Sequence, residues 1–191
     1  MLNYSYDRSF IAQVRCLSLD APGYLDCAKL VERGQQAARA ADDWMIVTSL
    51  VTKSPHMFMF RCLFDAAIGR PYYDIQSWSR KTGRDFQSAN CHLDCSNNGY
   101  AGLYAAPPGE QTLWKFMQMD EGGEWRSMTS IVEPGQTIRG RIHTRSNIPL
   151  QAYRKETVAG HWFAYVVNEG GQPMDLELDI LHVGQELMDD H

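Results

Sequence analysis

Turn signals at regular intervals constrain this 191-residue chain more than any other feature of its sequence. From Trp44 onward, short segments rich in β-branched and aromatic residues alternate with turn clusters such as Asn97-Asn98-Gly99 and Pro107-Pro108-Gly109. Short segments separated by regularly spaced turns are typical of an all-β sandwich or barrel. We therefore predict a mainly β protein, an antiparallel β-sandwich, with a barrel-like closure as the alternative. The predicted strands cover residues 44–52, 56–64, 72–79, 99–105, 112–120, 125–132, 136–144, 150–155, 161–167 and 174–183.

One earlier stretch shows helical rather than strand periodicity. Small and apolar residues recur at helical spacing over residues 24–41, after Pro22-Gly23 and before Asp42-Asp43. Gly34 weakens the middle of this stretch. We predict one amphipathic helix at about 24–41, followed by a β region at about 44–183, in a single domain spanning 1–191. The residues that set the helical spacing are Leu25, Ala28, Val31, Ala37, Ala38 and Ala41.

Charge and motif content exclude several classes of function. The chain has 18 Lys and Arg against 23 Asp and Glu and no basic block, so we expect no nucleic-acid partner. It lacks the run of roughly 18 apolar residues that crosses a bilayer, so we expect no membrane partner. Five cysteines at irregular spacing favour reduced thiols and a cytoplasmic protein. The signatures of serine hydrolases, zincins, P-loop proteins and dinucleotide-binding proteins are absent, and we expect no cofactor.

The densest group of reactive residue types lies between Cys91 and Gly99. Two thiols, His92 and a carboxylate could ligate zinc, but structural zinc sites use two separated ligand pairs and no second pair follows. Asp94, Ser96 and Asn98 alternate like the first half of a calcium loop, although Ala105 stands where the acidic closing ligand belongs. A tight Asn-Gly turn explains the same residues, so we predict no metal site and leave calcium binding at Asp94, Ser96 and Asn98 open.

A turn followed by a strand at residues 134–143, and then the apolar segment 160–167, resembles the late strands of concanavalin A-like β-sandwich proteins. That superfamily includes lectins, glucanases and fungal glutamic peptidases. The resemblance covers about a quarter of the chain and implies a sandwich fold. The catalytic residues of those enzymes have no counterpart here, and one such scaffold hosts many functions, so the resemblance implies no activity.

Two predicted strands combine aromatic and polar residues on one face. Faces that mix rings with a few hydrogen-bonding groups suit an organic ligand, since rings provide stacking area and polar groups fix its orientation. We therefore expect both faces to line one hollow between the sheets, completed by residues of the late strands. The two faces consist of Tyr72, Asp74, Gln76 and Trp78, and of Trp114, Phe116, Gln118 and Asp120. The late-strand residues are Arg139, Arg141, His143, His161 and Tyr165.

These faces predict a cofactor-independent protein that binds a largely hydrophobic small molecule. We expect an enzyme of cyclase or isomerase type, with Asp74, Asp120 or His161 as acid or base. Two alternative functions stay open. A homodimer is also a possible assembly. The first is a carbohydrate-binding or glycan-processing sandwich that stacks sugars on Trp78, Trp114, Trp125 or Trp162. The second is a protein-interaction module that uses a solvent-facing acidic row of Asp175, Glu177 and Asp179.

Overall fold

A computed structural model of the chain describes residues 1–18, 23–51, 54–81, 89–107 and 109–184. The strands in these residues form one antiparallel sheet that closes on itself. Within the described residues, nine strands make the closed barrel, in the order β2, β15, β11, β9, β6, β7, β8, β4 and β3, and β3 pairs again with β2. Strand β5 pairs with both β2 and β6, and the remaining strands pair outside the ring. The barrel-like alternative of the sequence analysis is therefore the one observed.

Most of the elements are short, as the frequent turn signals require, and β3 and β4 are the longest strands of the described residues. The strands of the first half are β1 Leu2–Tyr4, β2 Phe10–Cys16, β3 Gly23–Arg33, β4 Gln36–Thr48, β5 Met57–Asp65, β6 Arg70–Ser77, β7 His92–Cys95 and β8 Ala101–Tyr104. Those of the second half are β9 Trp114–Met119, β10 Trp125–Ser127, β11 Thr137–Thr144, β12 Gln151–Val158, β13 His161–Val167, β14 Gln172–Pro173 and β15 Leu176–Val183. The helical elements of the described residues are α1 Trp78–Lys81 and the 3-10 turns Tyr6–Arg8 and Glu110–Thr112.

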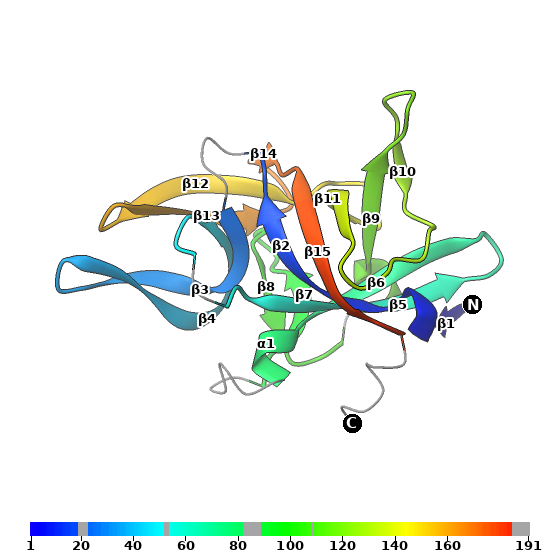
Figure 1. The fold of residues 1–191 in the computed structure, drawn as a ribbon, viewed down its shortest axis with the longest axis horizontal. Helices are drawn as coiled ribbons and strands as arrows, with labels where there is room; N and C mark the ends of the chain where they lie inside the picture. Colours follow the sequence, from blue (N-terminus) through cyan, green and yellow to red (C-terminus); the bar gives the residue numbers. More distant parts are fainter. Residues whose placement is uncertain (19–22, 52–53, 82–88, 108, 185–191) are drawn as a thin grey trace.

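The predicted amphipathic helix at 24–41 is wrong: the segment forms the long β3–β4 hairpin at the left of Figure 1. Gly34, with φ +65°, is the first residue of a two-residue turn, because Arg33 pairs with Gln36. A β-bulge between Cys27 and Ala28 explains the misleading periodicity. Leu25 and Cys27 face the core, but after the bulge Ala28 and its alternates face a separate outer cluster. The inserted residue breaks the period of two, and the apolar spacing then imitates a helix.

Every predicted strand overlaps an observed strand, with shifted ends. The sequence analysis missed β1, β2, β3, β7 and β14. Strand β2 carries a period-two signal, since Phe10, Ala12, Val14 and Cys16 are all buried in the main core. The inward side chains of the barrel strands form that core, and its aromatic centre includes the stacked rings of Phe10 and Phe60, 4.7 Å apart.

Hairpins extend from the barrel in several directions (Figure 1). The β3–β4 and β12–β13 hairpins lie at the left, the β5–β6 hairpin reaches to the right, and the β9–β10 hairpin rises at the top. No helix of the described residues is long and apolar enough to span a membrane. The right-hand side of this view, with β6, β9 and β10, is the part of the molecule on which the candidate site lies.

Candidate functional site

The two predicted ligand-binding faces point to opposite sides of the sheet. Tyr73 of β6 pairs directly with Trp114 of β9, and residues directly opposite each other share a face. Trp114 and Phe116 therefore lie in the core with Tyr73, whereas Tyr72 faces outward. The Trp114 ring is fully packed, and its Nε1 donates to the Leu93 carbonyl at 3.0 Å. The expected hollow between the Tyr72 and Trp114 faces is not formed.

The remaining residues of these two faces serve local contacts. Asp74 accepts hydrogen bonds from Gln76 at 2.6 Å and lies 2.9 Å from Nδ1 of His92. Trp78 lies in α1 and packs in a small outer cluster with Ile11 and Met59. The predicted strand 72–79 therefore ends at Ser77.

Asp120 and Gln118 belong to the β9–β10 hairpin. The Asp120 carboxylate accepts backbone hydrogen bonds from Gly122 and Glu124, both at 2.9 Å, and pairs with Arg126. These bonds lower the pKa of Asp120, and they hold the hairpin turn. Gln118 points its amide toward the Arg139 carbonyl at 3.4 Å.

Residues of the late strands do not gather around one hollow. His161 and Tyr165 lie on β13, and β6, β7, β8 and β4 separate this strand from β9 in the sheet. Arg139 and Arg141 lie on β11, where Arg139 pairs with Glu177 of β15 at 2.7 Å and Arg141 pairs with Asp175, just before β15, at 2.6 Å.

The acidic row of Asp175, Glu177 and Asp179 faces solvent only in part: Asp175 is exposed as expected, whereas Glu177 is buried. Glu177 is only 3% exposed, because Arg15 and Arg139 pair with its carboxylate from both neighbouring strands. Thr137 donates to Asp179 at 3.0 Å. Cross-strand pairing of this kind binds β2, β15 and β11 together along the barrel wall.

The Asp74–His92 pair makes the stability of the fold depend on pH. The hydrogen bond to Asp74 raises the pKa of His92 to about 9. A histidine whose pKa is raised in the folded state contributes its full stabilisation at pH values below its ordinary pKa near 6.5. This contribution is lost as the pH rises through 9. We expect His92→Gln to lower the free energy of unfolding by about 1 kcal/mol at pH 6 and by much less at pH 10. Urea denaturation at both pH values measures the free energy of unfolding. His161→Gln is the control and should cause no loss that depends on pH. Equal losses in His92→Gln at pH 6 and pH 10 would contradict the prediction.

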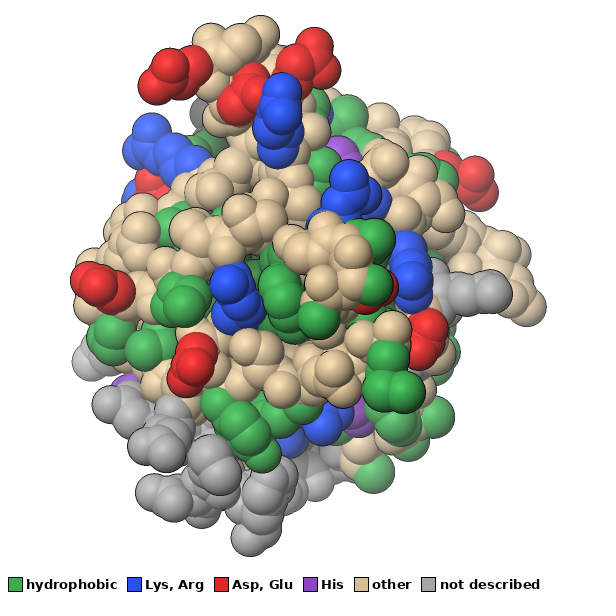
Figure 2. Space-filling view, turned by 90° about the vertical axis from the view of Figure 1, so that its right-hand side faces the viewer, with side chains coloured by type: hydrophobic (Ala, Val, Ile, Leu, Met, Phe, Trp, Pro, Cys, Tyr) green, Lys and Arg blue, Asp and Glu red, His purple; other side chains and the backbone are tan. Residues whose placement is uncertain are grey.

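A pocket of about 630 Å³ lies on the outer face, between the β5–β6 loop and strands β9, β10 and β11. We call it the outer pocket. Its walls carry the cations Arg70, Lys115 and Arg126, and Glu124 is the acidic residue among the described lining residues. Ile68, Met117 and Trp125 add apolar area. Figure 2 views the molecule from this side and shows Lys and Arg side chains interspersed with hydrophobic ones. The outer pocket is therefore amphipathic and predominantly cationic.

Lys115 lies in the wall of this pocket and is 6% exposed. It alternates with the core residues Trp114 and Phe116, so its side chain leaves the strand on the outer face. Its Nζ donates to the Arg145 carbonyl at 2.9 Å and to Oδ1 of Asn147. Burial lowers the pKa of Lys115, and the nearby charges of Arg70 and Arg145 lower it further.

His143 is the direct cross-strand partner of Lys115 on the outer face. Its Nδ1 donates to the Asn147 carbonyl at 3.1 Å, which leaves Nε2 as the acceptor of a neutral imidazole. Burial lowers the pKa of His143 to about 4, so the ring is neutral at physiological pH. Within the described structure, the buried Nε2 has no hydrogen-bond partner, and neither has the buried Oγ of Ser127 in the same pocket. Buried polar atoms are normally satisfied, so both atoms keep unused hydrogen-bonding capacity.

Trp125 completes the pocket with an aromatic wall. Its ring centre lies 6.1 Å from that of His143, and the Arg141 guanidinium lies 4.4 Å above the Trp125 ring. Of the residues predicted from sequence, the structure thus brings His143 and Arg141 together at one site, with Trp125 from the carbohydrate alternative.

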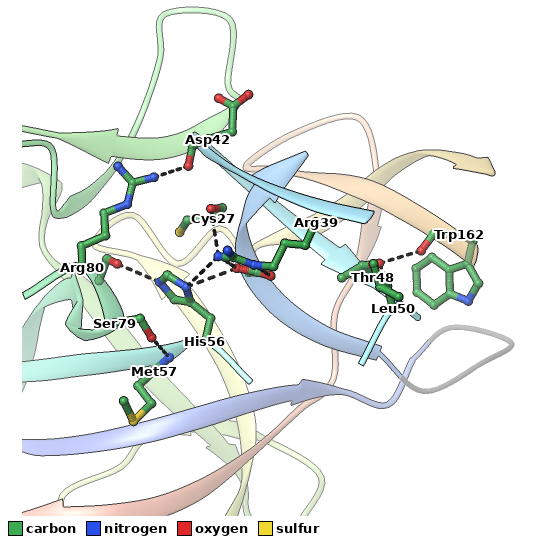
Figure 3. A network of polar contacts seen from close by, with 12 residues as sticks. Cys27, Arg39, Asp42, Thr48, Leu50, His56, Met57, Ser79, Arg80 and Trp162 are labelled. Carbon is green, nitrogen blue, oxygen red and sulfur yellow. Dashed lines mark hydrogen bonds and ion pairs between the residues drawn. The ribbon is translucent and has the colours of Figure 1, made fainter. Parts of the chain in front are cut away.

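A second polar cluster joins strands β3, β4 and β6 (Figure 3). His56 contacts Oδ1 of Asp26 through Nδ1 at 3.2 Å and Oγ of Ser77 through Nε2 at 2.7 Å. Arg39 holds Asp26 with two hydrogen bonds, of 2.5 and 2.7 Å. Burial raises the pKa of Asp26, but its bonds to His56 and Arg39 outweigh burial and lower the pKa to about 2.

Asp26 contacts His56, and His56 contacts Ser77, as the acid, base and nucleophile of a serine hydrolase do. However, Ser77 is fully buried at 0% exposure and is not among the residues that line the outer pocket, so its hydroxyl does not face a substrate there. Arg39 occupies both oxygens of the carboxylate, as in a structural ion pair. We therefore assign this cluster to the stability of the β3–β4 hairpin against β5 and β6.

The Cys91–Gly99 segment forms strand β7 and the turn before β8. Gly99 has φ +79°, and its N–H donates to the Ser96 carbonyl at 2.9 Å, as in a tight turn. Asp94 accepts a hydrogen bond from the Cys95 backbone at 2.7 Å. Among the described residues, no three His, Cys, Asp or Glu side chains are grouped closely enough to hold a metal ion.

Sequence reasoning missed Arg70, Lys115, Arg126 and Ser127. The strand 112–120 had been correctly recognised, but the ligand face was assigned to its aromatic side. A lysine between Trp114 and Phe116 was the available signal, because it must leave the strand on the side away from the core. Arg70 and Ser127 come from other strands, and no local pattern links them to Lys115.

Comparison of the chain with protein-family models, with curated proteins and with solved structures gives no match. The functional argument therefore depends on the outer pocket itself.

Proposed function

We propose that this protein binds a small organic anion with an aromatic or apolar part in the outer pocket. The observation that supports this most is the joint presence, in one pocket, of a buried lysine and two buried polar atoms without partners, His143 Nε2 and Ser127 Oγ. Arg70 and Arg126 supply positive charge for a carboxylate or phosphate. Trp125 and Met117 supply apolar area for the rest of the ligand.

The neutral His143 adds a further requirement. Because Nε2 accepts, a fitting ligand also presents a hydrogen-bond donor. Ser127 can accept or donate and therefore suits a hydroxyl or carbonyl group of the ligand. The proposal keeps the small-molecule partner expected from the sequence, but it places the ligand on the outer face and makes it anionic rather than largely hydrophobic.

Calorimetry with phenyl phosphate tests the proposal, with phenol as the uncharged comparison. We expect phenyl phosphate to bind and phenol not to bind. The double variant Arg70→Gln/Arg126→Gln should weaken phenyl phosphate binding roughly tenfold, about 1.4 kcal/mol. Arg33→Gln, at the exposed end of the β3–β4 hairpin, is the matched control and should change nothing.

Equal binding of phenol and phenyl phosphate would overturn the anionic part of the proposal. If neither phenol nor phenyl phosphate binds, the pocket assignment is overturned. An equal loss of phenyl phosphate affinity in Arg33→Gln would also overturn it. Tighter binding of phenyl glucoside than of phenyl phosphate would support the carbohydrate alternative instead.

A further inference from the structure

The surroundings of Lys115 point to a chemical step in the outer pocket. We propose that Lys115 forms an imine with a ligand that carries an aldehyde or ketone as well as its anionic group. This inference rests on the proposed function, because the pocket must first bind the anion. It narrows the ligand class to oxo acids and phosphorylated carbonyl compounds.

Hydrogen bonding leaves the Lys115 amine one free position. Two acceptors, the Arg145 carbonyl and Oδ1 of Asn147, hold its Nζ. A neutral amine has two N–H bonds and one lone pair, so these acceptors use both hydrogens and the lone pair stays available. Burial and the cations Arg70 and Arg145 lower the pKa of Lys115, which increases the fraction of neutral amine. Desolvation and neighbouring cations are the two ways in which proteins activate a lysine nucleophile.

A base lies on the neighbouring strand, directly opposite Lys115. Lys115 and His143 are paired residues on β9 and β11, and side chains of such pairs start about 4.5–5.5 Å apart at Cβ. The Nδ1–H of His143 is engaged by the Asn147 carbonyl, so Asn147 contacts both side chains and orients them. Nε2 of the neutral ring is therefore the atom that can take and return a proton.

The step balances without a further reactant. The Nζ lone pair attacks the carbonyl carbon, a C–N bond forms, and the carbonyl π electrons move to oxygen. His143 Nε2 takes one proton from Nζ and passes it to that oxygen. The nitrogen lone pair then forms the second C–N bond as the C–O bond breaks. His143 carries the second Nζ proton to the departing oxygen in the same way, and the oxygen leaves as water. One amine and one carbonyl thus give one imine and one water.

Pyridoxal 5′-phosphate is a suitable chemical probe because it combines an aromatic ring, a phosphate and an aldehyde. The probe is added at less than one equivalent, the imine is reduced with borohydride, and peptide mass mapping locates the adduct. We expect roughly tenfold more adduct on Lys115 than on the exposed Lys29, because binding of the phosphate in the outer pocket holds the aldehyde close to the Lys115 amine. Excess pyridoxine 5′-phosphate, which has an alcohol in place of the aldehyde, should protect Lys115.

Two variants separate chemistry from folding. Lys115→Arg keeps the charge but removes the nucleophile, and Lys29→Arg is its matched control. His143→Gln keeps the amine and should slow adduct formation about tenfold while pyridoxine 5′-phosphate still binds. This readout distinguishes a proton-transfer role of His143 from a structural one.

The outcomes distinguish the two proposals. If pyridoxine 5′-phosphate binds but no adduct forms on Lys115, the imine is overturned and the anion site stands. If pyridoxine 5′-phosphate does not bind, or if the adduct spreads evenly over the lysines without protection, the proposed function fails together with the imine.

Discussion

Replacement of Arg39 by Met should lower the free energy of unfolding by about 3–5 kcal/mol, because it leaves the buried Asp26 carboxylate without its main cation. Arg39 makes two short hydrogen bonds to Asp26, and Asp26 in turn contacts His56. Urea denaturation at pH 7 measures the loss. The matched control is Arg33→Met, on the same hairpin but exposed, which should stay within about 0.5 kcal/mol of the wild type.

The same network predicts the response to acid. A carboxyl group with its pKa lowered to about 2 stabilises the fold above its ordinary value near 3.8, and the contribution is lost as pH falls toward 2. The difference between the wild type and Arg39→Met should therefore shrink between pH 5 and pH 2. An Arg39→Met protein as stable as Arg33→Met, or a difference that does not change with pH, would show that the ion pair contributes little.

Replacement of Trp114 by Ala should cost about 3–5 kcal/mol of stability without changing affinity for phenyl phosphate in the folded protein. The Trp114 side chain is 2% exposed, packs in the main core, and satisfies the Leu93 carbonyl. Its loss creates a large cavity on the side of β9 away from the outer pocket. Thermal unfolding and calorimetry on the same sample measure the two effects.

Trp125→Ala provides the opposite case. This ring is only partly buried and lines the outer pocket, so we expect a stability loss near 1 kcal/mol and a clear loss of phenyl phosphate affinity. Trp114→Ala should therefore lower mainly the stability, and Trp125→Ala mainly the affinity for phenyl phosphate. If Trp114→Ala weakened binding as much as Trp125→Ala does, the aromatic side of β9 would be part of the ligand site after all.

The sequence predicted the β class because its signals are local. Turn residues at Pro107-Pro108-Gly109 or Asn97-Asn98-Gly99 act through the conformations that Gly, Pro and Asn adopt, whatever the rest of the chain does. The alternation of Leu176, Leu178 and Ile180 on β15 is equally local, and all three are buried in the core. Local patterns mislead where a strand is irregular. The bulge between Cys27 and Ala28 changes the spacing of apolar residues in the β3–β4 hairpin, and the altered spacing predicts a helix.

The ligand-binding side of each strand could not be derived in this way. Alternation separates the two faces of β9 but does not say which one lines a pocket, and aromatic residues are as common in cores as in ligand sites. That choice depends on the register of Tyr73 with Trp114. A shift by one residue would exchange the two faces.

By itself, the amino-acid sequence determined the mainly β class and the approximate position of most strands. Only the tertiary structure decided that the sheet closes into a barrel, that Trp114 and Phe116 fill it, and that Lys115, Ser127 and His143 meet outside it. The physical reason is that strand position follows from neighbours in the chain, whereas closure and the outer pocket follow from pairing between strands far apart in sequence.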